Sequence, residues 1–346
     1  MSAGPASRGV AAARRHAAVL LVGLGAFLAA LAILLRTYVY AQLALLPGTV
    51  TDQVVLEDEA AEYLDTTQWE TVEDVSVVRT EEVLAQQSPG NAGWSVWWVQ
   101  SGTEAEERPV DHVDRRVVVD RADGTAINCC GEHVNGDRAV RQAGLTLYWP
   151  PGAAPEDHPY YDADIRAAPA MRYEGVEEIG GIETRRYVQT IEATQLPDSV
   201  RSVPAEVLGE DGDGVVDAAR WLDLTRTVWV EPESGLPVHR EERRREALRG
   251  VDGRGEVVLL SADLETPPAQ VTANADHARQ RATLLRATQS WIPGLLLVLS
   301  PPLVTLGLIR YRRSRALDAA NDPEARTVSD PDAAPDSANG AGRTGD

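Results

Sequence analysis

The sequence predicts a mainly β ectodomain held between two transmembrane α-helices. Two runs of 19 residues, 17–35 and 291–309, contain no charged side chain, and a helix needs about 20 apolar residues to cross a bilayer. Between them, segments rich in β-branched and aromatic residues alternate with turn residues, which is typical of antiparallel strands. We therefore expect an antiparallel meander, forming a curved sheet or a sandwich-like fold, that is α+β in detail.

The spans and their flanking charges predict the topology. Three arginines precede the first apolar run, and four follow the second within six residues, so the positive-inside rule places both termini in the cytoplasm. The first run could be a cleaved signal peptide, but it exceeds the usual apolar core of about 7–15 residues, and we expect an uncleaved anchor. The expected parts are a cytoplasmic N-terminus (1–16), a first transmembrane helix (17–36), an extracytoplasmic domain (37–290) with a stalk helix at about 271–290, a second transmembrane helix (291–309) and a disordered cytoplasmic tail (310–346).

The strands follow one another with short connections. Asp123–Gly124 and Gly180–Gly181 are turn dipeptides of the hairpin type, and residues 231–237 form a tight loop with two prolines. A short helix is expected at 56–64, and residues 271–289 have a helix-forming composition. The expected strands are 69–78, 94–99, 116–120, 145–149, 172–179, 183–191, 225–230, 238–246 and 255–264.

The composition narrows the class of protein. The chain has 346 residues with 33 basic side chains, all arginine, and 53 acidic ones, which gives a net charge of −20. Such a balance argues against nucleic acid as a partner, because phosphate binding needs basic surfaces. Two cysteines exclude a four-cysteine zinc site and a fold that depends on several disulfides.

The two cysteines are neighbours, Cys129 and Cys130. Three alternatives are open: a vicinal disulfide that stiffens the loop, a pair of free or buried thiols, and bridges between molecules. Adjacent Cα atoms are about 3.8 Å apart, which is short for a relaxed disulfide. A metal site that used both cysteines and His133 would lack a fourth ligand with recognisable spacing, so no metal site is predicted.

No motif in the sequence announces catalysis. The acidic stretch 210–217 fails the register of an EF-hand and is better interpreted as a flexible turn. None of the six histidines stands in a metalloprotease motif, and neither a nucleophile elbow nor a phosphate-binding loop occurs. We therefore expect a protein that is not an enzyme and needs no cofactor.

Tryptophans concentrate at Trp94, Trp97 and Trp98. On a strand, Trp94 and Trp98 point to one face and Trp97 to the other. Core packing on both faces is one interpretation. The functional alternative is an apolar surface that binds an acyl chain.

Several segments carry a family resemblance: 36–40 (RTYVY), 128–137 (NCCGEHVNGD), 141–145, 160–162, 171–175, 187–191 and 225–235 (TRTVWVEPESG). In this order, over most of residues 17–309, they resemble the actinobacterial Porin PorA family of two-span envelope proteins, also described as a domain of unknown function. The resemblance implies two terminal spans around a β-rich ectodomain and supplies no catalytic residue. The stretch 227–237 is also similar to strands of periplasmic lipoprotein carriers, whose curved sheet holds acyl chains.

The strand pattern of this chain differs from that of the membrane β-barrels of porins. Strands of membrane barrels alternate apolar and polar faces, whereas charges fall on both faces here, as at Arg115–Arg116 and Arg185–Arg186. The uncharged spans also argue against an ion path through them.

The sequence therefore predicts a non-enzymatic, double-pass plasma-membrane protein of the cell envelope. Its ectodomain is expected to bind or conduct an envelope lipid or another envelope component. The alternatives are a porin or channel-forming protein, and a module that docks envelope proteins. The expected partners are the lipid bilayer and such envelope lipids or proteins, with no nucleic acid.

Overall fold

The computed structural model describes residues 5–211 and 214–320 and divides into two units. One unit contains the residues up to Leu35 together with those from Trp291, and the other is Arg36–Ser290. The first unit is helical and the second is mostly antiparallel sheet, so the predicted fold class is confirmed. We describe each unit by itself.

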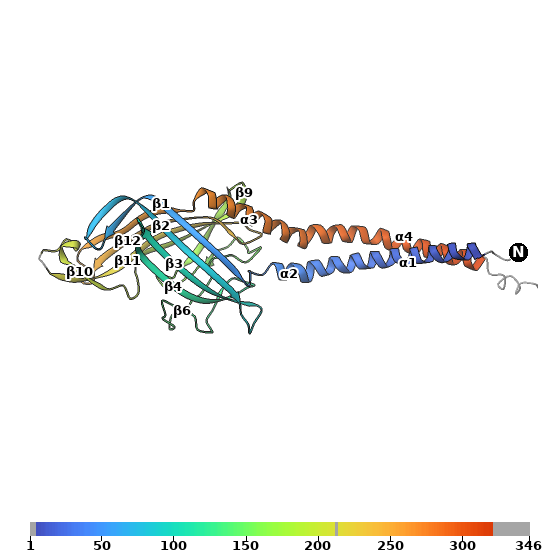
Figure 1. Ribbon diagram of the computed structural model, residues 1–346, viewed down its shortest axis with the longest axis horizontal. Coiled ribbons are helices and arrows are strands. Elements are labelled where there is room, and N and C mark those ends of the chain that lie inside the picture. Colours follow the sequence, from blue (N-terminus) through green and yellow to red (C-terminus); the bar gives the residue numbers. More distant parts are fainter. Residues whose placement is uncertain (1–4, 212–213, 321–346) are drawn as a thin grey trace, which may run out of the picture. The chain divides into compact units, whose positions relative to one another are not determined.

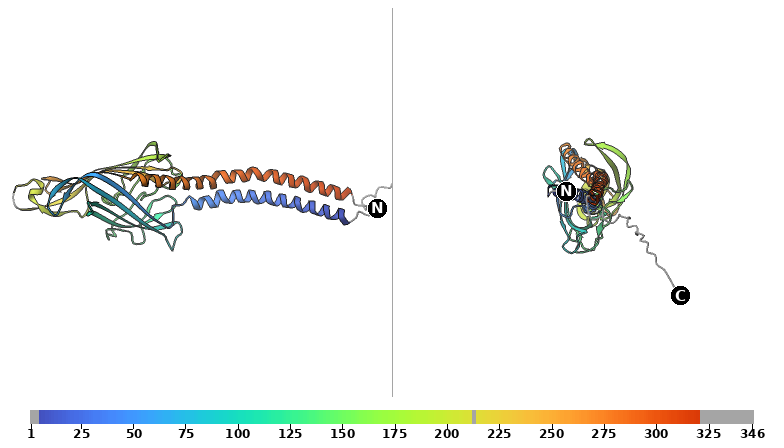
Figure 2. Two further views of the ribbon diagram at one scale, coloured as in Figure 1. Left: turned by 45° about the horizontal axis from the view of Figure 1, so that its top comes forward. Right: turned by 90° about the vertical axis from the view of Figure 1, so that its right-hand side faces the viewer.

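The helical unit is a pair of long helices, α1 (Pro5–Leu34) and α4 (Ile292–Ala320). Figures 1 and 2 show them side by side. They pack closely at Gly25, whose carbonyl accepts a hydrogen bond from Ser300 Oγ at 2.8 Å. A Cβ atom at Gly25 would lie 2.6 Å from Val304 Cγ2. Small residues at helix contacts are typical of membrane helices, because they let backbones approach closely.

Both apolar stretches are long enough to cross a membrane. The helical stretches Arg15–Leu43 and Pro268–Ala316 meet the length and composition of a membrane span. They run through π-helical turns, η1 (Leu35–Val39) and η3 (Ala287–Trp291), and α2 (Tyr40–Leu43) follows η1. Helix α4 continues to Ala320, so residues 310–320 of the tail are helical and not disordered as predicted, and the remainder of the tail lies outside the described residues.

The second unit is built on one large antiparallel sheet. Its order is β5-β4-β3-β2-β1-β13-β12-β11-β9-β8-β7, with β6 on β4 and β10 on β11. The first and last long strands, β1 and β13, are therefore neighbours. The bounds are β1 (Val50–Asp65), β2 (Glu70–Gln87), β3 (Trp94–Ala105), β4 (Arg108–Asp120), β5 (Ala126–Ile127), β6 (His133–Val134), β7 (His158–Pro159), β8 (Ala170–Ile179), β9 (Ile182–Gln195), β10 (Arg201–Pro204), β11 (Val215–Val230), β12 (Pro237–Gly250) and β13 (Glu256–Glu265), with a 3-10 turn η2 (Ala205–Leu208) and helix α3 (Pro268–Arg286).

The sheet curls strongly around its inner face, as Figures 1 and 2 show. Arg244 of β12 lies 3.8 Å from Asp111 of β4, although β13, β1, β2 and β3 separate these strands in the sheet order. The two edges remain open as strands, but single bridges join Leu145 to Thr125 beside β5 and to Tyr160 beside β7. The segment 121–169 between β4 and β8 therefore lies across the opening.

Two local predictions are wrong. Residues 56–64, predicted as a helix, belong to β1, which pairs with β2 and β13. Residues 145–149, predicted as a strand, form no strand in the described chain and make only the single bridges of Leu145. The acidic stretch 210–217 lies partly outside the described residues.

The inner face of the sheet has three bands. Apolar side chains occupy both ends of the strands, and charged side chains lie between them. Along β2 the inward side chains are Val75 and Val77, then Arg79 and Glu81, then Val83 and Ala85. Both apolar bands form clusters with the neighbouring strands, so the core of this unit is divided by a polar layer.

Candidate functional site

The polar layer is a belt of charged side chains on the inner face of the sheet. On β12, every second residue from Arg240 to Glu246 points inward, because side chains of a strand alternate between faces. Their inward neighbours come from β2, β4, β11 and the segment 121–169. The charged belt comprises Arg79, Glu81, Asp111, Arg115, Asp162, Asp164, Arg220, Arg226, Arg240, Glu242, Arg244 and Glu246.

Glu242 lies at the centre of the charged belt and is fully buried. Its Oε1 accepts hydrogen bonds from Arg226 Nε at 2.7 Å and from Arg240 Nε at 2.8 Å. Arg79 Nε lies 3.8 Å from the other oxygen. Burial alone would raise the pKa of Glu242, but these arginines outweigh it and hold the pKa well below its usual range.

A second group surrounds Arg244, which is also buried. Its Nε donates to Glu246 Oε1 at 2.7 Å, and its Nη2 donates to Asp164 Oδ2 at 2.8 Å. Asp111 lies at the edge of this group. Burial raises the pKa of Asp111, and the nearby carboxylates Asp164 and Glu246 act in the same direction against the arginines. The charged belt therefore contains a carboxyl group that is only partly compensated.

The segment 121–169 contributes the remaining carboxylates of the charged belt, Asp162 and Asp164. Asp162 Oδ2 accepts a hydrogen bond from Arg226 Nη2 at 2.9 Å. Gln189 Nε2 of β9 donates to the carbonyl of Tyr160 at 2.8 Å. These contacts place Tyr160, Asp162 and Asp164 inside the curved sheet, so the segment fills the interior.

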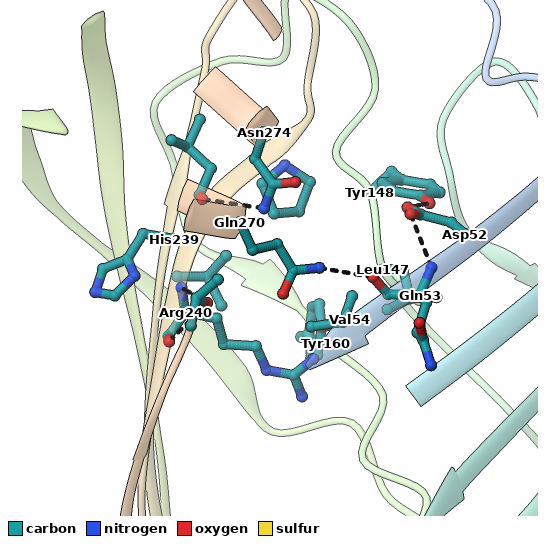
Figure 3. A pocket seen from close by; sticks show the side chains of 14 residues that line it. Asp52, Gln53, Val54, Leu147, Tyr148, Tyr160, His239, Arg240, Gln270 and Asn274 are labelled. Carbon is teal, nitrogen blue, oxygen red and sulfur yellow. Dashed lines mark hydrogen bonds between the residues drawn. The ribbon is translucent and has the colours of Figure 1, made fainter. Parts of the chain in front are cut away.

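Two small cavities lie in this interior. The first, of about 50 Å³, is lined mainly by β1, β12, α3 and the segment 121–169, and Figure 3 shows Gln270 and Asn274 of α3 facing it. Gln270 Nε2 donates to the Gln53 carbonyl at 2.8 Å. The second, of about 30 Å³, lies within the charged belt. Tyr160 and Arg240 line both cavities and separate them.

Neither interior cavity is large enough for a lipid. Pockets for drug-sized ligands measure about 300–1,000 Å³, whereas these hold only one or a few water-sized groups. The charged belt also interrupts the apolar surface that an acyl chain would need. The interior of the sheet therefore offers space only to small polar species.

The three predicted tryptophans lie on two faces of β3. Trp97 is fully buried in the apolar band, with its ring centroid 5.5 Å from that of Tyr148. Trp94 and Trp98 are half-buried on the outer face. Trp98 lines an open groove of about 730 Å³ together with Leu84 and Gln100. Trp97 is therefore separated from the other two, and a ligand surface on the outer face would involve Trp98.

The structure joins Cys129 and Cys130 in a vicinal disulfide. It lies in the loop between β5 and β6, where Cys130 adopts a left-handed conformation with φ of 64°. The carbonyl of Cys130 accepts a hydrogen bond from Arg116 Nη1. This loop is thereby attached to the outer face of β4.

A possible metal-ligand set lies on the outer face, and sequence reasoning missed it. His239, Glu241 and Glu265 offer ligand atoms within 4.8 Å of one another. His239 and Glu241 are two residues apart on β12 and point to the same face, and Glu265 is the partner of Glu241 on β13. Glu241 and Glu265 are exposed, and three such groups on a surface are not sufficient to indicate a bound ion.

Sequence reasoning also missed the charged belt. The signal was present in residues 240–246 (REERRRE), where a strand has no apolar side chain on either face. Such a strand has to bury charges if it lies at the centre of a sheet, and β12 lies between β11 and β13. The partners on β2, β4 and β11 are too distant in sequence to be identified by spacing.

Comparisons with known proteins agree on one family. The sequence profile of the family described as Porin PorA matches residues 17–309. A protein named Porin PorA from Corynebacterium amycolatum is 25% identical over 44% of this chain and 43% of its own length. The chain thus spans less than half the length of this relative, while the name and the two candidate spans fit a membrane protein. The chain belongs to the Porin PorA family.

Proposed function

We propose that the protein is a non-enzymatic, porin-type protein of the cell envelope, in which the interior of the curved sheet is a path for small ions or polar solutes. The charged belt carries this proposal. A polar interior distinguishes porins from proteins that enclose lipid, and some barrels are closed by a plug. The segment 121–169 has the position of such a plug, because it occupies the interior and binds the charged belt through Asp162.

The route across the membrane has to come from the helices. Outward side chains of the sheet are charged and exposed, as at Glu241, Arg243 and Arg245 of β12, so this face does not suit contact with lipid. One pair of helices supplies no charged lining, because residues 17–35 and 291–309 are uncharged. We infer that several copies together surround the membrane pore, and that each sheet forms a vestibule.

Planar-bilayer recording of the full-length protein tests this function. We expect discrete conductance steps in wild type. Tyr160→Ala removes the side chain that separates the two interior cavities, so its steps should be larger or differ in ion selectivity. Arg243→Gln, at an 80% exposed side chain on the outer face, is the matched control and should conduct like wild type.

Two results would refute the proposal. One is a folded wild-type protein that is silent over many reconstitutions. The other is a conducting protein whose steps are the same in Tyr160→Ala and wild type, because the current would then bypass the interior of the sheet.

A second candidate function rests on the groove at Trp98. This groove is open, about 730 Å³ in volume, and lined by apolar and polar side chains, including Leu84, Gln100 and Glu82. An aromatic ring beside amide and carboxyl groups suits an amphipathic envelope component, such as a lipid with a polar head group. The groove is large enough for such a ligand, unlike the interior cavities.

Native mass spectrometry of full-length protein from its own host, with lipid analysis, tests this binding. We expect a stoichiometric envelope component on wild type and its loss from Trp98→Ala. Val200→Ala, at another exposed apolar residue, is the control and should retain the component. Wild type that carries no component, or Trp98→Ala that carries as much as wild type, would contradict the second function.

The orientation in the membrane is part of the proposal. The arginines that flank the apolar runs support cytoplasmic termini and an extracytoplasmic sheet. Of two reporter enzymes fused at the C-terminus, the one that works only in the cytoplasm should be active and the one that works only outside it should be inactive. The sheet should be accessible to protease from outside. Periplasmic-type activity of the C-terminal reporter would reverse the topology.

A further inference from the structure

The cavity within the charged belt contains hydrogen-bonding atoms that have no protein partner. Arg115 Nη1, Thr146 Oγ1 and Tyr161 OH are buried and form no hydrogen bond with the residues that the structure describes. The three residues are 3%, 2% and 3% exposed, and all three line this cavity. A buried donor without a partner is costly, and most such groups in proteins are satisfied. Three of them around one cavity indicate a shared ligand.

These atoms are suited to an acceptor. A guanidinium group can only donate, and both hydroxyl groups can donate. The Arg115 guanidinium carbon lies 5.5 Å from the centre of the Tyr161 ring, so the two groups are neighbours in the cavity lining. Burial raises the pKa of Tyr161 to about 12, which keeps its hydroxyl protonated near neutral pH.

The charge of the lining favours an anion. Four arginines line the cavity against three carboxylates, which are Glu81, Asp162 and Asp164. Arg79, Arg226 and Arg240 also face Glu242, whereas Nη1 of Arg115 has no partner among the described residues. A cation would meet the guanidinium groups directly. The buried charge of Arg115 is unfavourable unless it is paired.

We propose that this cavity binds one small monovalent anion of halide size, which accepts hydrogen bonds from Arg115, Thr146 and Tyr161. The volume of about 30 Å³ admits a halide ion or one to two water molecules. Larger anions such as gluconate do not fit. The site does not depend on conduction, because an anion that is bound only in the folded state acts on the stability of the sheet.

Thermal unfolding of the full-length protein in uncharged detergent tests the site. The probes are chloride and bromide, each replacing gluconate at constant ionic strength. A ligand that binds only the folded state raises the unfolding temperature with its concentration. We therefore expect a saturable rise in chloride and in bromide. Anomalous scattering from bromide-soaked crystals should give a peak beside Arg115.

Two variants assign the effect to this cavity. Arg115→Met keeps an unbranched aliphatic stem but removes the guanidinium group and its charge, and should abolish the halide dependence. Tyr161→Phe removes a single oxygen and should weaken halide binding roughly tenfold, as expected for one hydrogen bond to a charged group. Arg116→Met, on the same strand but the outer face, is the control and should respond to halide like wild type.

The proposal is overturned if wild type unfolds at the same temperature in chloride and gluconate, because water alone would then fill the cavity. It is also overturned if both Arg115→Met and Tyr161→Phe keep the wild-type halide dependence. Should Arg115→Met fail to fold, Tyr161→Phe decides the question, since it preserves the packing of the ring. The unfolding experiment does not depend on conductance. A protein that is silent in planar bilayers would therefore refute the porin function and leave the test of the anion site valid.

Discussion

Glu242→Gln is the sharpest test of the charged belt, because Glu242 has the densest set of partners. The side chain is fully buried and accepts hydrogen bonds from Arg226 at 2.7 Å and Arg240 at 2.8 Å. Arg79 approaches its second oxygen at 3.8 Å. Glutamine has nearly the same shape, so the substitution removes the charge while the packing stays the same.

The magnitude follows from what is left behind. Removal of one partner of a buried ion pair costs about 3–5 kcal/mol, mainly because the other charge stays buried and unpaired. The carbonyl oxygen of glutamine has two lone pairs and can still accept the hydrogen bonds from Arg226 and Arg240, so we expect the lower end, about 3 kcal/mol. In a domain of this size, that corresponds to a loss of roughly 6–12 °C in the unfolding temperature.

Unfolding of the full-length protein in detergent, followed by near-ultraviolet circular dichroism, measures this loss. Glu241→Gln is the matched control, because Glu241 is the preceding residue on β12 and its side chain is 50% exposed on the outer face. Its stability should change by less than about 0.5 kcal/mol. Equal small losses in the two variants would refute the reasoning, since Glu242 would then not be the buried counter-charge of three arginines.

Three further outcomes are expected. Arginines overcome burial and hold the pKa values of Glu242 and Glu246 below the usual range. The stabilisation by these two carboxylates is therefore present above their unfolded-state pKa and is lost as the pH falls through the lower folded-state values. Unfolding temperatures measured between about pH 7 and pH 3 should fall accordingly, and stability that rose on acidification would contradict this prediction. Gly25→Ala places a methyl group 2.6 Å from Val304 Cγ2 and should cost about 1–3 kcal/mol in the unfolding of the helices. Gly23→Ala, whose new methyl group would meet no described atom within 4 Å beyond its own helical turn, should cost nothing. The vicinal disulfide predicts that the peptide from unreduced protein is two hydrogen masses lighter than after reduction, and an unchanged mass would indicate free thiols.

The elements that could be predicted from sequence are those with local signals. The two uncharged runs indicated the helices by length and composition alone. Gly180 and Gly181 indicated a hairpin, and both have positive φ, 59° and 71°, between β8 and β9. Glycine adopts such angles without steric cost, so this turn depends only on the two residues themselves.

The error at 56–64 has a physical cause. Register shifts interrupt the pairing of β1 between Asp58 and Ala61 and between Ala61 and Tyr63. Such bulges insert extra residues and break the alternation of inward and outward side chains. The remaining pattern, with alanine and glutamate between apolar residues, resembles a helix. Pairing on both sides with β2 and β13 decides the conformation against this local preference.

The candidate site could not be predicted, because it is assembled from distant residues. Arg240 and Glu81 are 159 positions apart and form an ion pair of 2.9 Å. Only the curvature of the sheet brings them together. The segment 121–169 adds Asp162, which sequence reasoning treated as part of a family signature without chemistry. A single sequence shows that charges alternate on a strand, but it does not show which face is buried.

The charged belt is unfavourable for a lipid in the interior of the sheet and favourable for a small ion. Buried ion pairs add little net stability compared with apolar packing, so stability alone does not account for a belt that divides an otherwise apolar interior. An acyl chain that ran through the interior would have to separate the ion pairs around Glu242, and each separated charged group would lose its partner. A small ion meets side chains of both charges, and a side chain can replace its ion-pair partner by the ion. A lipid is therefore expected on the outer face at Trp98, and small ions in the interior, so that Trp98→Ala and Tyr160→Ala should affect separate activities.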